Sequence, residues 1–252
     1  MSHHKLEVKK LHFSYPDGYE AIKEMSFTIY HGESVGIFGA NGAGKSTLLM
    51  LLMGILFPDD GEVLVGDVRM TPKTLPMMRQ RLGMVFQNPD DQLFMTTVYD
   101  DVAFGPRNYK LDESEVAVRV KSALEMVGIP HLEDRAPFKL SGGEKRSVAI
   151  ATVLSMTPDV LIMDEPTSGL DPKSRRRVIT LLKSFEHTKI ITSHDLDMVF
   201  ETCQRVIVIK DGKIAADGLA ANILADVQLM DNCGLELPLS LQNCPICSLS
   251  KK

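Results

Sequence analysis

The sequence predicts an α/β fold built around a largely parallel β-sheet with flanking helices. Three observations lead to this prediction. Apolar runs of strand length alternate with segments of helical periodicity, which is typical of a parallel sheet covered by helices. One such run, Ser34–Phe38, continues into a glycine-rich turn and then a helical segment. Another, Val160–Met163, ends directly in the two carboxylates Asp164 and Glu165.

Local patterns predict the first elements of this core in order. Leu6–Tyr15 is expected to form an edge strand, and Ser34–Phe38 a buried one. A helix is expected over Ser46–Leu56, before Pro58. Gly61–Met70 is expected to form a hairpin that turns at Gly66-Asp67, a common tight-turn pair. These elements would give the core an antiparallel β edge.

An inserted helical lobe is predicted over about residues 88–156, where the helical character dominates. Asp112–Glu115 has the pattern of a capping box, and Gly128 stands where a helix C-cap belongs. Between them an apolar face recurs at helical spacing. That face consists of Val116, Val120, Ala123, Leu124 and Val127.

The core is expected to resume with the strand Val160–Met163. A helix should then begin with Asp171 as its cap and Pro172 at its first position. Lys189–Thr192 and Arg205–Lys210 are expected to be further strands, the latter turned back by Asp211-Gly212. We expect one domain over residues 1–230 and a short tail over residues 231–252, for which the sequence predicts no structure.

Composition restricts the classes of function. The chain has 252 residues, a net charge of -5, 44% hydrophobic residues and 24% charged residues, the balance of an ordinary globular protein. A mildly acidic net charge argues against general affinity for nucleic acid, which needs a basic face, although it does not forbid a local basic patch. We therefore expect no nucleic-acid partner. No run approaches the roughly 18 apolar residues of a membrane span, and Met1–Lys10 has no apolar signal core. We therefore expect a chain that is neither exported nor membrane-spanning.

The four cysteines are expected to be reduced thiols, because no export signal is predicted. They are Cys203, Cys233, Cys244 and Cys247. Cys244 and Cys247 form a CxxC pair, but a lone pair lacks the second ligand pair of zinc sites. Metal binding and regulation by Cys233, Cys244 and Cys247 is the alternative hypothesis.

The glycine-rich turn has the pattern of a P-loop, with a strand before it and a helix after it. Its glycines let backbone N–H groups approach phosphate oxygens, and the helix that follows offers its positive end to the anion. Lys45 can reach the β- and γ-phosphates, and the Ser46 hydroxyl can bind magnesium. The loop comprises Gly39, Ala40, Asn41, Gly42, Ala43, Gly44, Lys45, Ser46 and Thr47.

The carboxylates after Val160–Met163 fit the same chemistry. A parallel strand beside the P-loop strand would bring Asp164 to the magnesium shell and Glu165 close to the γ-phosphate, where it can polarise water. A strand end that is acidic by chance is the alternative, and the P-loop makes it the poorer one. Together the motifs predict a nucleoside triphosphatase that uses magnesium.

The family is indicated by Leu140-Ser141-Gly142-Gly143-Glu144. Ser141 and Glu144 have capping-box spacing, and the two glycines would leave N–H groups facing a ligand. A well-capped helix and nothing more is the alternative. The run resembles the LSGGQ/E signature of ABC ATPases, and over about residues 6–217 the chain is similar to that family. The resemblance implies the ABC ATPase fold, ATP hydrolysis, and ATP contacts for Ser141, Gly142, Gly143 and Glu144.

The resemblance also assigns roles to residues that, taken one at a time, would more often be structural. Tyr15 takes the place of the aromatic residue that stacks on adenine, and Gln87 that of the Q-loop glutamine, a magnesium ligand. Ser168–Asp171 resembles the D-loop, and His194 the switch histidine at the γ-phosphate. With Glu165, Gln87 and His194 form the implied catalytic set, and Ser46, Gln87 and Asp164 the implied magnesium ligands.

The resemblance also implies an ATP-dependent, head-to-tail dimer, in which the signature of one subunit closes over the P-loop of the other. Because Glu165, His194 and the signature are intact, a homodimer would have two competent sites. A heterodimer with a related ATPase is the alternative.

Two stretches, Gln87–Phe94 and Thr97–Pro106, together with Glu144–Ala151, resemble the ATPases of energy-coupling-factor importers, especially cobalt and nickel (CbiO-like) members. This implies a peripheral subunit at the cytoplasmic face of the membrane. Its partners would be an integral coupling subunit, received in a groove over Leu93–Gly105, and a substrate-capture subunit. The alternative for Leu93–Gly105 is that it only forms the core of the helical lobe. The alternatives are a vitamin importer, a non-transport ABC ATPase on nucleic acid or ribosomes, and a small-molecule kinase.

Overall fold

The computed structural model describes residues 5–242. Its centre is a six-stranded sheet, parallel except at the edge strand β10. In spatial order the strands are β10 (Lys213–Leu219), β9 (Arg205–Lys210), β3 (Ser34–Phe38), β8 (Thr188–Thr192), β7 (Val160–Asp164) and β6 (Leu82–Val85). The predicted α/β fold with a largely parallel sheet is confirmed.

The antiparallel edge is a separate four-stranded sheet in which β1 pairs with both β2 and β4. Its order is β2 (Glu20–Ile29), β1 (Leu6–Ser14), β4 (Asp60–Val65) and β5 (Val68–Arg69). The predicted hairpin at Gly66-Asp67 is the β4–β5 pair. The strand β2 was not predicted.

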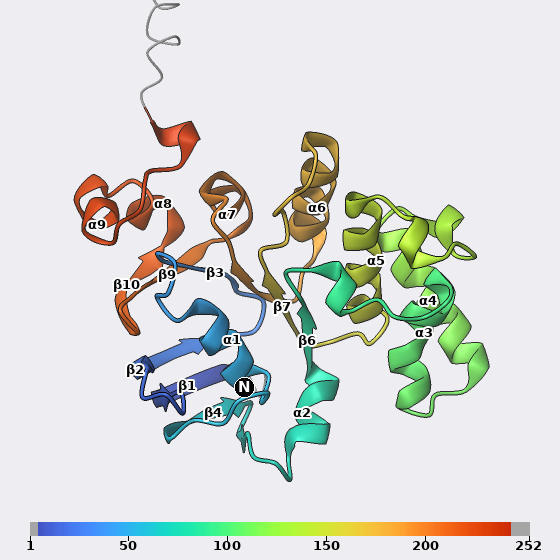
Figure 1. Ribbon diagram of the computed structural model, residues 1–252, viewed down its shortest axis with the longest axis horizontal. Coiled ribbons are helices and arrows are strands. Elements are labelled where there is room, and N and C mark those ends of the chain that lie inside the picture. Colours follow the sequence, from blue (N-terminus) through green and yellow to red (C-terminus); the bar gives the residue numbers. More distant parts are fainter. Residues whose placement is uncertain (1–4, 243–252) are drawn as a thin grey trace, which may run out of the picture.

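Helices surround the central sheet unevenly. Figure 1 shows α3, α4 and α5 gathered beyond β6, and the antiparallel sheet on the opposite side. The helices are α1 (Lys45–Leu52), α2 (Leu75–Arg81), α3 (Val98–Asn108), α4 (Glu113–Met126), α5 (Gly142–Leu154), α6 (Pro172–Ser184), α7 (Leu196–Thr202), α8 (Ala220–Ile223) and α9 (Val227–Asn232). Short 3₁₀ turns occur at η1 (Pro89–Asp91), η2 (Pro130–Leu132), η3 (Pro137–Lys139) and η4 (Leu239–Leu241).

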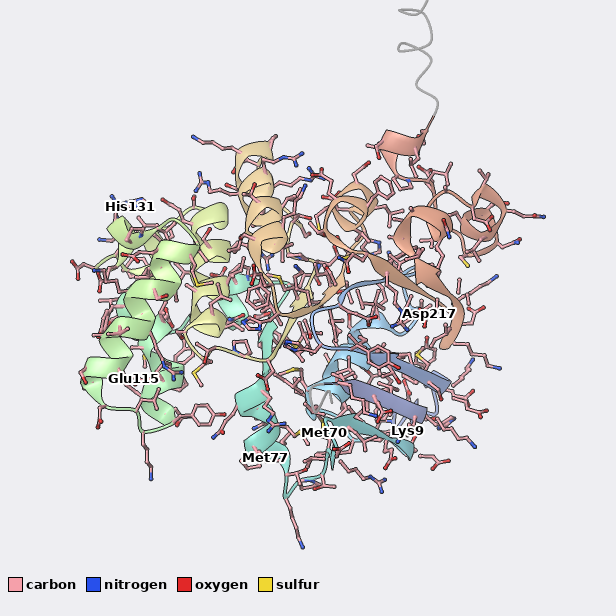
Figure 2. All side chains as sticks on the ribbon, turned by 180° about the vertical axis from the view of Figure 1, so that it is seen from behind. Lys9, Met70, Met77, Glu115, His131 and Asp217 are labelled. Atoms are coloured by element: carbon pink, nitrogen blue, oxygen red, sulfur yellow. The ribbon has the colours of Figure 1, made fainter. Side chains whose placement is uncertain are left out.

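Two cores explain why β7 is apolar from Val160 to Met163. Along β7, Leu161 and Met163 face a core shared with α3 to α7. Val160 and Ile162 face a second core, shared with α1 and the antiparallel sheet. Because side chains alternate across a strand, a sheet covered on both faces needs apolar residues at every position. In Figure 2 Glu115 marks the helical side of the molecule and Lys9 the antiparallel sheet.

Three local predictions were wrong. Leu6–Tyr15 was predicted to be an edge strand, but β1 lies inside the antiparallel sheet, because it pairs with β2 on one side and β4 on the other. The first helix, α1, ends at Leu52 rather than Leu56, because Gly54 adopts φ +62°, outside the helical region. The side chain of Asp112 caps no backbone group at the start of α4, although the helix begins at the predicted place. The predicted apolar face of α4 is buried, and Gly128 closes the helix with φ +73°.

The C-terminal part has structure that the sequence did not predict. Beyond β10, α8 and α9 pack against the core, and Leu235 and Leu237 continue this packing. The carboxylate of Asp197 accepts backbone N–H groups of Leu239 and Ser240, which fastens η4 to α7. No helix within residues 5–242 is long and apolar enough to cross a membrane.

Candidate functional site

The three predicted catalytic residues, Glu165, Gln87 and His194, meet in one cavity of about 260 Å³. It lies where the carboxyl ends of β3, β6, β7 and β8 meet, the usual place for ligands in an open parallel sheet. Its walls combine the P-loop with side chains that follow the three other strands. The lining residues are Tyr19, Asn41, Gly42, Gly44, Lys45, Ser46, Thr47, Gln87, Asp164, Glu165 and His194.

The P-loop owes its shape to glycines. Gly42 and Gly44 have φ angles of +79° and +107°, which side chains of L-residues disfavour. A Cβ at Gly44 would also lie 2.6 Å from the carbonyl oxygen of Ala21. Of the predicted loop, Gly39, Ala40 and Ala43 do not line the cavity. The first and last of these pack inside the fold; a Cβ at Gly39 would collide with the carbonyl oxygen of Ile209.

The Lys45 ammonium bends over this loop. It donates to the carbonyl oxygens of Gly39 at 2.8 Å and Ala40 at 3.2 Å. Burial lowers the pKa of the Lys45 ammonium, and the carboxylates of Glu165 and Asp164 oppose this shift. The cavity therefore holds one cation and two anionic side chains within electrostatic reach of each other.

The two carboxylates differ in environment. One oxygen of Asp164, Oδ1, accepts the Thr192 hydroxyl at 2.5 Å. Glu165 is buried and adopts φ +48°, an uncommon angle for a residue that is not glycine. Its Oε2 accepts the backbone N–H of His194 at 3.1 Å. Its Oε1 is buried without a hydrogen-bond partner in the described residues, so an acceptor remains available at the cavity.

His194 lies beside this free acceptor. Its Nε2 is 3.5 Å from Oε1 of Glu165, and its side chain is 54% exposed. The next residue, Asp195, fixes the turn that carries it, through a two-fold hydrogen bond from Arg175 and one from the Thr167 hydroxyl. The turn after β8 is thereby tied to the turn after β7.

The aromatic side of the site contains two tyrosines where the sequence predicted one. The Tyr15 hydroxyl is 3.0 Å from that of Thr47, but Tyr15 does not line the cavity. Tyr19 does line it, donates to the carbonyl oxygen of Gly42 at 2.9 Å, and stacks on Tyr15 at 6.5 Å between centroids. The resemblance identified Tyr15 alone. Tyr19, in the turn before β2, belongs to no recognised motif and was missed.

The signature residues lie elsewhere in the same chain. Ser141 and Glu144 form the predicted capping box of α5, and the bond from the Ser141 hydroxyl, at 2.7 Å, lowers the pKa of Glu144. Gly142 lines a second cavity, of about 410 Å³, together with Ser168 and Gln87. None of the four signature residues lines the P-loop cavity. Gln87 borders both.

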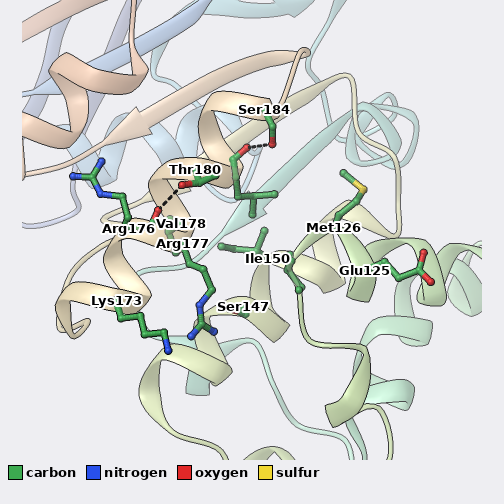
Figure 3. Close-up of a pocket in the computed structure, with 13 residues that line it drawn as sticks. Glu125, Met126, Ser147, Ile150, Lys173, Arg176, Arg177, Val178, Thr180 and Ser184 are labelled. Atoms are coloured by element: carbon green, nitrogen blue, oxygen red, sulfur yellow. Dashed lines mark hydrogen bonds between the residues drawn. The ribbon is translucent and has the colours of Figure 1, made fainter.

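A larger groove, of about 550 Å³, contains none of the predicted site residues. Figure 3 shows it between α4, α5 and α6, with Ile150 and Val178 on its apolar wall and Lys173 and Arg177 at its edge. Its lining has no group that suits nucleotide chemistry better than the P-loop cavity, so size does not identify the site here.

Of the three cysteines in the metal-binding hypothesis, Cys233 lies within the described residues. Cys233 is buried, with 4% of its surface exposed, whereas Cys244 and Cys247 lie outside the described residues. Within residues 5–242 no group of three or more His, Cys, Asp or Glu side chains is arranged to hold a metal ion.

Known sequences identify the family of this chain. The sequence model of a family described as ABC transporter matches residues 22–168. A Geobacter sulfurreducens protein, provisionally named an ABC transporter ATP-binding protein, is 59% identical over 98% of this chain and 99% of its own length. The energy-coupling factor transporter ATP-binding protein EcfA of Methanothermobacter thermautotrophicus is 44% identical over 92% of this chain and 76% of its own length.

Solved structures share the fold along most of the chain. CbiO1 of Clostridium perfringens, described as part of the ABC transporter complex CbiONQ, has a TM-score of 0.83 and 40% identity, and 98% of each chain is covered. The ATP-binding cassette MJ0796, a dimer in a post-hydrolysis state with ADP and phosphate, has a TM-score of 0.77 and 27% identity. That comparison covers 85% of this chain and 98% of MJ0796.

Proposed function

Since this chain belongs to the ABC transporter family as one of its ATP-binding ATPase subunits, we propose that it powers a membrane importer of the energy-coupling-factor type, for cobalt or nickel ions. The observation that carries the ATPase role is the cavity that collects Lys45, Asp164, Glu165 and His194 around the P-loop. The similarity to EcfA and to CbiO1 supports the type of importer.

Within that cavity the P-loop binds the ATP phosphates. Its backbone N–H groups and the N-terminus of α1 favour an anion, and Lys45 exchanges its bonds to Gly39 and Ala40 for phosphate oxygens. Tyr15 and Tyr19 together offer a stacked aromatic surface for the adenine ring. The Thr47 hydroxyl, bonded to Tyr15, keeps that surface next to the loop.

The residues present fit Mg²⁺, which prefers oxygen ligands. Ser46, Gln87 and Asp164 all line the cavity with oxygen donors, and Asp164 has its second carboxylate oxygen, Oδ2, beside the one that Thr192 engages. When bound, the ion neutralises charge that develops on the phosphate oxygens. Thr192 and the strand end orient Asp164 for this role.

Glu165 is the proposed general base. Its Oε2 is held by the backbone of His194, which leaves Oε1 to accept a proton from the attacking water. His194, at 3.5 Å from Oε1, is placed to contact the γ-phosphate and to orient that water. Gln87, two residues after β6, also lines the cavity and completes the set.

The signature acts in the partner subunit's site. Ser141, Gly142, Gly143 and Glu144 do not line the P-loop cavity of their own chain, which supports a head-to-tail dimer with two shared sites. The dimeric cassette MJ0796 is a structural precedent. In this proposal residues 1–230 form the ATPase domain, the lobe of residues 88–156 presents the signature, and residues 231–252 form the tail. The dimer is of this chain with itself or with a related ATPase.

An exposed aromatic pair is the proposed contact for the integral coupling subunit. Phe94 and Phe104 are 64% and 41% exposed, and their rings meet edge to face at 4.9 Å. The carboxylate of Asp101 accepts the backbone N–H groups of Phe94 and Met95, each at 3.0 Å, and so holds the loop that carries the first ring. An apolar surface of this kind is typical of an interaction site. In this proposal the chain lies at the cytoplasmic face of the membrane, where the pair contacts the coupling subunit.

Copurification from detergent-solubilised membranes tests the importer proposal. The tagged chain should bring down a small integral protein and a substrate-capture protein, and the capture protein identifies cobalt, nickel or a vitamin as the cargo. Phe104→Asp should abolish this recovery, because a charge in an apolar contact is costly. Tyr30→Asp, at a residue that is 55% exposed outside the pair, is the control. Recovery with ribosomes or DNA instead would refute the importer.

A further inference from the structure

Arg146 is a buried arginine that donates hydrogen bonds to the backbone of the Q-loop, at Phe86 and Gln87. It lies in the second turn of α5 and is 2% exposed. Its Nη1 donates to the carbonyl oxygen of Phe86 at 2.7 Å, and its Nη2 to that of Gln87 at 2.5 Å. A planar guanidinium can hold two neighbouring acceptors in one fixed geometry. Arg146 thus fixes the backbone at the point from which Gln87 enters the site.

The guanidinium has no carboxylate to neutralise it. Within residues 5–242 no acidic side chain forms an ion pair with Arg146, and its Nε is buried without a partner. Burial lowers the pKa of Arg146, and the more distant charges of Asp164 and Glu165 oppose this shift. Burying a cation that is stabilised mainly by carbonyl dipoles costs free energy, so packing alone does not explain an arginine at this position. Within residues 5–242, the charge-assisted hydrogen bonds to the carbonyl groups of Phe86 and Gln87 come from this side chain alone.

Two more side chains tie the same segment to α5. Gln92 accepts the N–H of Phe86 at 3.1 Å and donates to the carbonyl oxygen of Ala149 at 2.8 Å. Lys145 bonds Asp90 at 2.6 Å. Residues 86–92 are therefore fastened to α5 along its first turns. Because α5 begins at the signature, a shift of that helix carries the Q-loop with it.

We propose that Arg146 is a positioning residue, which couples the place of Gln87 in its own P-loop cavity to the signature helix that serves the other subunit. Its side chain does not line the P-loop cavity. Its effect passes through the carbonyl groups of Phe86 and Gln87. The inference rests on the proposed roles of Gln87 and of the signature. It makes closure of one shared site a condition for correct geometry in the other.

A double-mutant cycle on the full chain tests whether Arg146 acts through Gln87. Arg146→Met keeps most of the buried volume and removes the donors. Turnover should fall by up to about 100-fold, the cost of a small misplacement at a reacting centre, while ATP affinity is unchanged. In a Gln87→Ala background the same substitution should cause no further loss. Arg119→Met, at an arginine on the surface of α4 bonded to Glu115, is the matched control.

Two readouts separate positioning from mere stability. Thermal unfolding reports whether Arg146→Met folds; if it does not, Arg146→Lys takes its place in the cycle, since an ammonium cannot form the planar two-fold contact. In a Glu165→Gln background, ATP-dependent dimer on size-exclusion chromatography should decrease with either Arg146 variant. Losses that multiply with those of Gln87→Ala, or an unchanged dimer population, would overturn the inference.

The proposed function has its own outcome in the same assays. If Glu165→Gln alone hydrolyses ATP at the wild-type rate, the catalytic assignment fails whatever Arg146 does. If Glu165→Gln abolishes turnover but Arg146→Met turns over normally, only the coupling role of Arg146 fails. The two results cannot be confused, because they depend on different single variants.

Discussion

The substitution Glu165→Gln gives the sharpest test of the site. It keeps the shape of the side chain and removes its charge and basicity. The amide oxygen can still accept the N–H of His194, which Oε2 accepts at 3.1 Å. The amide nitrogen would then occupy the place of Oε1, 3.5 Å from Nε2 of His194, and could donate to it. We therefore expect an intact fold that has lost its general base.

The size of the effect follows from that chemistry. A positioned base contributes about 10²–10⁴-fold to a rate. At about 1.4 kcal/mol for each factor of ten, the barrier should rise by about 3–5 kcal/mol. Stability should hardly change, because Oε1 of Glu165 has no hydrogen bond to lose within the described residues. ATP binding persists, so the ATP-bound dimer should accumulate.

The assay measures phosphate release at saturating ATP, together with dimer content on size-exclusion chromatography. Glu24→Gln is a matched control, because Glu24 is exposed and also adopts a positive φ, of 57°. The control should hydrolyse ATP like the wild-type chain and form no long-lived dimer. Turnover of Glu165→Gln within a factor of about three of wild type, well short of the loss of a general base, would refute the role of this carboxylate.

Three further predictions concern binding and stability. Lys45→Ala should weaken fluorescent-ATP binding about 10- to 100-fold, the value of one charge-assisted bond; unchanged affinity would contradict the P-loop assignment. Tyr15→Ala should weaken binding by about 1–3 kcal/mol if adenine stacks as other bases do, and an equal loss for GTP and for a triphosphate without a base would argue against stacking. Burial raises the pKa of Asp195, but bonds from Arg175, the backbone and Thr167 outweigh it and hold the pKa below 3.8. A depressed carboxyl pKa adds stability that is present above the usual value of 3.8 and is lost as the pH falls below it. Asp195→Asn should therefore cost about 1–2 kcal/mol in urea unfolding near pH 7, and less below pH 3.8; a pH-independent difference would contradict the Arg175 pairing.

Much of the site could be predicted because its residues are contiguous or follow strands. A P-loop is a local object: glycine torsions, a strand before it and a helix after it determine its shape. The capping box of Ser141 and Glu144 is likewise made of neighbours, and the structure contains it. Sequence patterns failed where an exposed side chain can bond to water instead of to a neighbouring backbone group. Asp112 is such a case, because its side chain caps no backbone group of α4.

By itself the sequence determined many of the elements, though not β2 or the C-terminal helices, together with the α/β class and the resemblance to ABC ATPases, because these depend on periodicity and short motifs. Only the tertiary structure decided which distant residues meet. The hydrogen bond from Arg146 to the carbonyl oxygen of Gln87 joins residues that are 59 positions apart. Tyr19 lines the cavity because the turn that carries it folds against the P-loop. Such contacts are set by the order of strands in a sheet and by burial, and neither leaves a periodic trace along the chain.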